Sequence, residues 1–155
     1  MAIRAVIFDI GGVLKHMTNP AVLRAWEGRL GLAEGELRPL IYDSAIARES
    51  SVGRAAPAAV WQEANQRLRL SPAELSALQA DMPRAFTWDE GLLAFIRSLR
   101  PRCKTAVLSN AWSDARHEMQ DVVNSDTFDV IVYSSEEGLL KPQAEIYERT
   151  LARLG

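Results

Sequence analysis

The hydrophobic positions along the chain form two patterns, short unbroken apolar runs and longer stretches with helical spacing. The unbroken, β-prone runs lie at about 3–8, 104–108 and 128–133. Such runs are typical of strands buried on both faces of a parallel sheet. Helical stretches separate and follow the runs, so the sequence predicts an α/β fold, a doubly wound parallel sheet flanked by helices.

The long stretch between the first two strands carries the helical pattern. One apolar face comprises Val22, Leu23, Trp26 and Leu30, and another comprises Val60, Trp61, Ala64 and Leu68. Ser71-Pro72-Ala73-Glu74 is a capping box with proline at the first helical position, so a further helix begins there. We therefore predict an all-helical insert over residues 16–84, without strands, inside a core formed by residues 1–15 and 85–155.

The later segments return the chain to the sheet. Thr87-Trp88-Asp89-Glu90 is a second capping box. It opens a helix whose predicted buried side comprises Leu92, Leu93, Phe95, Ile96 and Leu99. Another helix is predicted over about 113–123. The last helix follows Lys141-Pro142, and Gly155 is placed as its C-terminal cap.

Composition and charge narrow the class of protein. The 155 residues are 48% apolar and 25% charged, which is typical of a globular domain with a sizeable core. A net charge of −2 without a basic patch argues against a nucleic-acid partner. We see no signal-peptide pattern and no apolar run of the roughly 20 residues that a bilayer requires. We therefore predict a cytoplasmic protein without a membrane partner, and the single cysteine, Cys103, fits a reducing compartment.

Polar residues follow each predicted strand. Asp9 follows the first strand and enters the turn Gly11-Gly12, which permits a sharp bend and brings backbone amides close to a phosphate-sized anion. Ser109-Asn110 follows the second strand, and Lys141 follows the third. Because the carboxyl ends of parallel strands lie at one edge of a sheet, these residues are predicted to share a pocket. A carboxylate nucleophile, phosphate-binding donors and a cation are the groups that phosphoryl transfer needs.

The order and content of these segments resemble the haloacid dehalogenase superfamily of hydrolases. Phe8-Asp9-Ile10-Gly11-Gly12-Val13-Leu14 is similar to the first family motif, Leu108-Ser109-Asn110 to the second, and Gly138-Leu139-Leu140-Lys141-Pro142 to the third. The resemblance implies a Rossmann-like core with an inserted all-α cap that closes over the substrate. It also implies magnesium as the cofactor and an aspartyl phosphate as the intermediate.

The resemblance further implies a role for each matching residue. Asp9 would be the nucleophile and a magnesium ligand, with the backbone carbonyl of Gly11 as a second ligand. Gly12, Ser109 and Asn110 would hold the transferring phosphoryl group. Lys141 would pair with both this group and Asp9, as a catalytic and substrate-binding residue.

Two positions depart from the family pattern. Phosphatases of the family carry a second aspartate two residues after the nucleophile, where Gly11 stands here, and a glycine performs no acid–base chemistry. His16 is the nearest titratable residue that would replace it. The fourth family motif, an acidic pair that completes the magnesium site, would lie beyond Gly155. We therefore expect a truncated sequence or an altered metal site, and a first strand at the sheet edge that is open to self-association.

The favoured function is that of a magnesium-dependent phosphatase of a small phosphorylated metabolite. A 2-haloacid dehalogenase with the same nucleophile is the alternative enzyme, although the family's dehalogenases resemble Asp-x-Tyr in the first motif. A non-catalytic relative that binds a ligand or partner is the third hypothesis. The residues of the insert that are candidates for substrate specificity are Trp26, Tyr42, Arg48, Glu49 and Trp61, although helical aromatics more often belong to a core.

Overall fold

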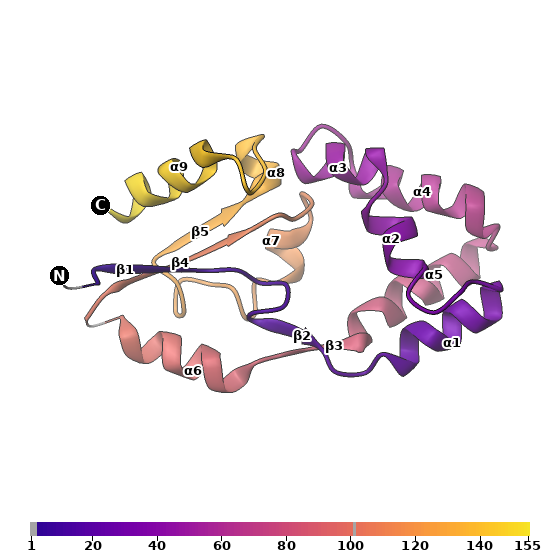
Figure 1. Cartoon of the computed structure of the whole chain (residues 1–155), viewed down its shortest axis with the longest axis horizontal. Helices are drawn as coiled ribbons and strands as arrows, with labels where there is room; N and C mark the ends of the chain where they lie inside the picture. The colour runs from indigo at the N-terminus through magenta and orange to yellow at the C-terminus, as the bar shows by residue number, and fades with distance from the viewer. Residues whose placement is uncertain (1–2, 101) are drawn as a thin grey trace.

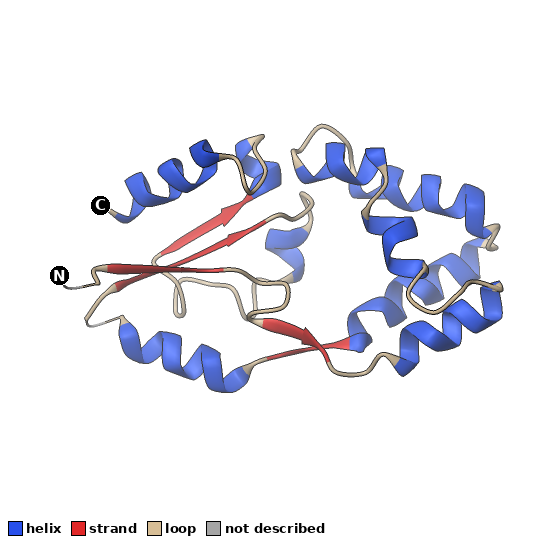
Figure 2. Cartoon of the chain, in the orientation of Figure 1, coloured by secondary structure: helices blue, strands red, loops and turns tan. Residues whose placement is uncertain are grey.

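Three parallel strands form the central sheet. The computed structural model describes residues 3–100 and 102–155. It places β1 (Ala5–Phe8), β4 (Lys104–Ser109) and β5 (Val130–Tyr133) in the order β1-β4-β5 (Figure 1). Phe8 is in register with Val107, and Ser109 with Tyr133. The strands therefore run in one direction, and their carboxyl ends face the helices α1–α5 (Figures 1 and 2).

The central strand β4 contributes side chains to both faces of the sheet. Val107 packs in a cluster with Leu93 and Ile96 of α6 (Glu90–Leu99). The next residue, Leu108, packs with Ile146 of α9 (Ala144–Leu154) on the other face. All five side chains are fully buried. Helices on both faces of a parallel sheet confirm the predicted α/β fold.

A helical unit with its own core lies beyond the carboxyl ends of the strands. Within the described residues it consists of α1 (Ala21–Leu30), α2 (Leu37–Tyr42), α3 (Ala45–Ser51), α4 (Pro57–Leu68) and α5 (Pro72–Asp81). Their apolar faces enclose a separate hydrophobic cluster in which Leu37, Ile41 and Leu78 are fully buried. The capping box at Ser71 is formed as predicted. The exact division into residues 1–15, 16–84 and 85–155 stays a prediction.

A two-stranded antiparallel ribbon connects the sheet to the helical unit. It consists of β2 (Lys15–Met17) and β3 (Phe86–Trp88), and a short 3-10 helix, η1 (Met82–Ala85), leads into β3. The prediction that residues 16–84 contain no strand is therefore wrong at its first positions. Each strand has only three residues, too few for an alternating pattern to be recognised in the sequence.

Two predicted details of α6 are wrong. The cap is Asp89, whose carboxylate accepts a hydrogen bond from the Leu92 amide at 2.8 Å, because Thr87 is already paired in β3. Phe95 is 54% exposed. Leu93 and Ile96 occupy the side of the helix that faces the sheet, and Phe95 lies about 100° from Ile96 around the helix axis.

The helix predicted over 113–123 is also much shorter than expected. α7 spans only Ala115–Glu118. The side chain of Asn124 donates to the carbonyls of Gln120 and Asp121, both at 3.2 Å. The Asn124 side chain therefore holds these two carbonyls in a turn. An asparagine side chain in this position competes with the backbone amides that would otherwise continue the helix. At the other end of the core, Gly155 caps α9 as predicted.

β1 forms one edge of the sheet, because in residues 3–100 and 102–155 it pairs only with β4. Self-association through this edge stays a prediction. The longest described helix, α4, has 12 residues. None of the helices in this part of the chain has the length and hydropathy of a membrane span.

Candidate active site

A tight turn after β1 holds Asp9 at the strand end. The Ile10 carbonyl accepts hydrogen bonds from the amides of Leu14 and Lys15, both at 2.9 Å, and these bonds fold the segment back on itself. Leu14 is fully buried and anchors the turn in the core. Gly12 has a φ of 77°, a left-handed conformation that glycine adopts at no steric cost. The two glycines thus form the sharp bend expected from the sequence.

The Asp9 carboxylate forms an ion pair with Lys141. Nζ of Lys141 lies 2.6 Å from Oδ1 of Asp9, and the same oxygen accepts a hydrogen bond from the Ile10 amide at 2.7 Å. The side chain of Lys141 is 16% exposed, whereas that of Asp9 is 42% exposed. Among the described residues, Oδ2 of Asp9 has no hydrogen-bond or ion-pair partner. One carboxylate oxygen is therefore held by the cation and the other is open to a ligand.

Asn110 fixes the backbone of Lys141 from the neighbouring loop. Its Nδ2 donates to the Lys141 carbonyl at 3.1 Å, and its Oδ1 accepts from the Lys141 amide at 2.9 Å. Ser109, at the end of β4, is almost buried and faces the same cavity as Asn110 and Lys141. The loops that follow the three strands therefore join into one surface, which we call the core wall: Asp9, Gly11, Ser109, Asn110 and Lys141.

The two glycines of the turn differ in what their backbones offer. The Gly12 amide donates to the Lys15 carbonyl at 3.0 Å, so it closes the turn and is not free to meet an anion in this conformation. The substrate contact expected of Gly12 stays a prediction. Gly11 makes no backbone hydrogen bond within the described part of the chain, which leaves its amide and its carbonyl available.

The donors for a magnesium ion are few. In residues 3–100 and 102–155 there is no group of three or more His, Cys, Asp or Glu side chains that could hold a metal. The open oxygen of Asp9 and the unpaired carbonyl of Gly11 are nevertheless hard oxygen donors of the kind that magnesium prefers. Magnesium is often held by one or two carboxylates, with waters and substrate phosphate completing its coordination. The residues present fit a metal bound in this way.

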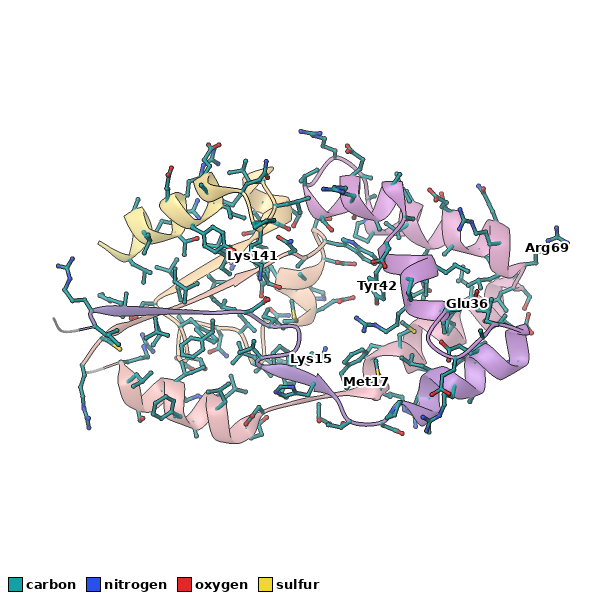
Figure 3. All side chains as sticks on the ribbon, viewed as in Figure 1. Lys15, Met17, Glu36, Tyr42, Arg69 and Lys141 are labelled. Carbon is teal, nitrogen blue, oxygen red and sulfur yellow. The ribbon has the colours of Figure 1, made fainter. Side chains whose placement is uncertain are left out.

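A cavity of about 1360 Å³ lies between the core wall and the helical unit. Gly11, Ser109, Asn110 and Lys141 line it on the core side, and Asp9 adjoins it through its neighbour Ile10 and its partner Lys141. The opposite side, which we call the helical wall, comprises Arg38, Tyr42, Arg48 and Trp61. Figure 3 shows Lys15, Tyr42 and Lys141 around this space.

Of the five residues that the sequence offered as candidates for substrate specificity, some line this cavity and others lie outside it. Tyr42, Arg48 and Trp61 line it. Trp26 is buried in the core of the helical unit, where its Nε1–H donates to Asp81 at 3.1 Å. Glu49 does not line the cavity, and its carboxylate lies 3.7 Å from Arg54. The structure therefore places three of the candidates on this cavity and two outside it, with Glu49 in the lining of a small neighbouring crevice.

An aromatic contact joins the two sides of the cavity. Trp112, in the loop after β4, stacks on Tyr42 with ring centroids 5.0 Å apart. Burial raises the pKa of Tyr42, while the nearby Arg38 guanidinium opposes this shift. Sequence reasoning missed Trp112, although its position two residues after Asn110 at a strand tip was an available signal. Arg38 was missed as well, and helical periodicity alone gave no signal for it.

Four further charged residues line the cavity without having been predicted: Lys15, Asp43, Asp114 and Glu118. Burial raises the pKa of both Asp114 and Glu118. Burial lowers the pKa of Lys15, and the Glu118 carboxylate opposes that shift. His16, the residue considered as a replacement acid or base, does not line the cavity, and its Nε2 lies 4.0 Å from Asp89.

A sequence model of the haloacid dehalogenase-like hydrolases matches residues 3–155. The chain therefore belongs to the haloacid dehalogenase-like hydrolase family, as the motifs led us to expect. No curated protein sequence matches the chain.

Several solved structures share this fold. A haloacid dehalogenase family enzyme from Bacteroides thetaiotaomicron is 16% identical, with a TM-score of 0.75 over 98% of this chain and 78% of that one. The same enzyme has been solved in complex with magnesium and inorganic phosphate. A predicted hydrolase of the family from Porphyromonas gingivalis is 20% identical, with a TM-score of 0.69 over 97% of this chain and 75% of that one. The L-2-haloacid dehalogenase from Xanthobacter autotrophicus is 22% identical, with a TM-score of 0.63 over 99% of this chain and 66% of that one.

Proposed function

We propose that the protein is a magnesium-dependent phosphatase that acts on a small phosphorylated metabolite through an aspartyl-phosphate intermediate. The observation that carries this proposal is the contact of Lys141 with Oδ1 of Asp9 at 2.6 Å, which leaves Oδ2 unpaired. A cation beside a carboxylate reduces its repulsion from a phosphate, and the open oxygen has the character of a nucleophile. The complex of the Bacteroides enzyme with magnesium and inorganic phosphate supports the same class of substrate.

The residues of the core wall divide the proposed work among them. The Asp9 carboxylate attacks phosphorus and forms the aspartyl phosphate, while the bond from phosphorus to the ester oxygen breaks and that oxygen takes a proton from water. Lys141 offsets the charge that develops on the phosphoryl oxygens, and the Ser109 hydroxyl and Gly11 amide donate hydrogen bonds to them. A water molecule then hydrolyses the aspartyl phosphate, which releases inorganic phosphate and restores the Asp9 carboxylate.

Magnesium would be held by Asp9 and the Gly11 carbonyl, with waters and substrate oxygens as its other ligands. When bound, the ion supplies charge neutralisation and orientation of the phosphoryl group. The helical unit would serve as a cap. Its residues Arg38, Tyr42 and Trp61 would contact the part of the substrate that leaves with the ester oxygen.

A haloacid dehalogenase remains the second candidate function. Its support is the similarity of the chain to the Xanthobacter dehalogenase and the shared requirement for a carboxylate nucleophile. Gly11 argues against it, because the dehalogenase motif has tyrosine at that position. The phosphatase is therefore the preferred proposal.

The test is an assay of the 155-residue chain against p-nitrophenyl phosphate and L-2-chloropropionate, each with magnesium or with EDTA. We expect release of p-nitrophenol only with magnesium, and no release of chloride. Chloride release without magnesium would favour the dehalogenase. Turnover of neither compound, by a chain whose circular dichroism shows a folded protein, would reject the phosphatase and favour the non-catalytic hypothesis. The Asp9→Asn variant serves as the blank for contaminating phosphatase.

A further inference from the structure

We propose that the leaving group of the substrate carries a second anionic group, a carboxylate or a second phosphate, and that Arg38 on the helical wall binds it. This inference rests on the proposed phosphatase function, because it assigns the core wall to the phosphoryl group. It makes Arg38 a specificity-determining residue.

The start of α2 is fixed in place. The Glu27 side chain is almost completely buried, and its Oε1 accepts hydrogen bonds from the amides of Gly35 at 2.9 Å and Leu37 at 3.2 Å. Leu37 itself is fully buried in the core of the helical unit. Arg38, the next residue, lines the cavity. The backbone that carries Arg38 is therefore positioned before any ligand binds.

The Arg38 guanidinium contacts aromatic rings and leaves its N–H groups unused. Its central carbon lies 5.3 Å from the centre of the Phe86 ring and 5.8 Å from that of Tyr42. Across the described residues it has no carboxylate or hydrogen-bond partner. The arginines of neighbouring segments that do have carboxylate partners are Arg24, Arg29, Arg54 and Arg84. Contact with aromatic rings suits a guanidinium that presents its planar edge, with several donors, to an anion.

The other cations that line the cavity are paired or lie elsewhere than on the part of the helical wall that carries Arg38. Lys15 lies on the β2–β3 ribbon with its Nζ 5.2 Å from the centre of the Trp88 ring, and Lys141 is paired with Asp9. Arg48 also lines the small crevice of about 290 Å³ that contains Lys141, so its charge lies on the phosphoryl side. Arg38 is therefore the cation of the helical wall that is available to a group distant from the phosphoryl site.

The size of the cavity agrees with a substrate that spans both walls. Its volume of about 1360 Å³ far exceeds the space that a phosphate alone requires, since even sites for drug-sized ligands occupy about 300–1,000 Å³. A carboxylate or phosphate suits the fork of an arginine, because two parallel N–H donors match its two oxygens. Arg38 is exposed, so a neutral leaving group would leave its donors to water and gain nothing from its charge.

The test is a binding measurement that does not depend on turnover. Phosphonopropionate and phosphonobutyrate are titrated calorimetrically into the magnesium-containing protein and compared with propyl- and butylphosphonate, which lack the second anion. Ethylene- and propylenediphosphonate form a second arm that distinguishes a phosphate from a carboxylate. For the wild type we expect at least one probe with two anions to bind about 10- to 100-fold more tightly than its alkyl counterpart.

The Arg38→Gln variant should lose this preference while its affinity for the alkylphosphonates changes by less than about threefold. Arg38→Lys should retain part of the preference, because a point charge attracts an anion without the bidentate geometry. The matched control is Arg69→Gln, since Arg69 lies at the far end of the helical unit and does not line the cavity (Figure 3). Its preference should equal that of the wild type.

Two outcomes would overturn the inference: equal binding of all probes by the wild type, or an undiminished preference in folded Arg38→Gln. Hydrolysis of p-nitrophenyl phosphate by the same preparations separates this failure from that of the proposed function. Turnover of that ester without any preference for a second anion would reject the role of Arg38 alone. A preference for two anions without turnover would reject the phosphatase while leaving Arg38 as an anion-binding residue.

Discussion

The core wall and the helical wall enclose one cavity but are held by different kinds of contact. On the core wall, Lys141 is bound through its ammonium to Asp9 and through its backbone to Asn110, with contacts of 2.6 to 3.1 Å. On the helical wall, Arg38 and Tyr42 are placed by ring contacts whose centres lie 5.0 to 5.8 Å away. Hydrogen bonds and ion pairs at short range fix direction, whereas contacts between ring faces tolerate small displacements.

This difference fits the separate tasks that we propose for the two walls. A reacting carboxylate must be held within a fraction of an ångström of its productive position, since a misplacement of 1 Å costs about 10²-fold in rate. Recognition of a leaving group requires less exact placement. The residues of the core wall should therefore be sensitive even to isosteric changes, whereas the helical wall should tolerate conservative ones.

The largest effect is expected from Asp9→Asn. The amide keeps the shape of the side chain but supplies no anionic nucleophile, so phosphatase activity should fall by more than about 10³-fold. The measurement is kcat with p-nitrophenyl phosphate, together with a circular dichroism spectrum that should match the wild type. Asp121→Asn, at an exposed position away from the cavity, should keep full activity. An Asp9→Asn enzyme with most of its turnover would remove Asp9 from the mechanism.

Lys141→Met should have the next largest effect. The variant keeps the length and packing of the side chain but removes the cation beside Asp9, so we expect kcat to fall by about 10²–10³-fold. Lys104→Met is the matched control, because Lys104 stands at the opposite end of β4 from Ser109. Equal activity of the two variants would show that the ion pair does not contribute to turnover.

Asn110→Ala separates positioning from charge on the core wall. It removes both hydrogen bonds to the Lys141 backbone but leaves the ammonium group in place. We expect kcat to fall by about 10- to 100-fold, mainly because the cation is held less accurately. Full kinetics with p-nitrophenyl phosphate test this expectation, and Asn19→Ala, outside the cavity, is the control. A rise in KM with kcat unchanged would contradict it and assign Asn110 to ground-state binding.

The smallest effect on the chemistry is expected from Gly53→Ala, which acts where the helical unit touches the core. A Cβ atom at Gly53 would overlap the carbonyl oxygen of Ser135, in α8 (Ser134–Glu137), and Gly53 also has a φ of 74°. Nearby, the Ser134 hydroxyl donates to the Ser51 carbonyl at 2.6 Å. The substitution should displace the helical wall while leaving the contact of Asp9 with Lys141 in place.

Gly31→Ala is the control for Gly53→Ala. Gly31 has a φ of 69° but open space at its Cβ position, so its replacement tests the backbone conformation alone. We expect urea denaturation to show an additional loss of about 1–3 kcal/mol for Gly53→Ala, the cost of overpacking. Equal losses in the two variants would mean that the contact between Gly53 and Ser135 adjusts without cost.

Local sequence patterns predicted that the residues of the core wall lie together, and in the structure they do. Asp9, Ser109 and Lys141 were found because each follows a strand or a turn that short-range patterns define, and parallel strands bring their carboxyl ends together. The same patterns placed α1, α4 and α5, with the capping box at Ser71, but not α2 and α3 individually. They failed for β2 and β3, which are too short to show a period, and for the length of α7, which the Asn124 side chain limits.

The sequence by itself thus determined the parallel sheet, its flanking helices and the strand ends at which the candidate site residues stand, because these depend on propensity, periodicity and strand direction. Only the tertiary structure decided which face of each helix meets the cavity. It buried Trp26, exposed Phe95 and brought Arg38 and Tyr42 opposite the core wall. The physical reason is that helical spacing marks an apolar face but not the partner against which that face packs, and the orientation of the helical unit depends on contacts between residues far apart in the chain.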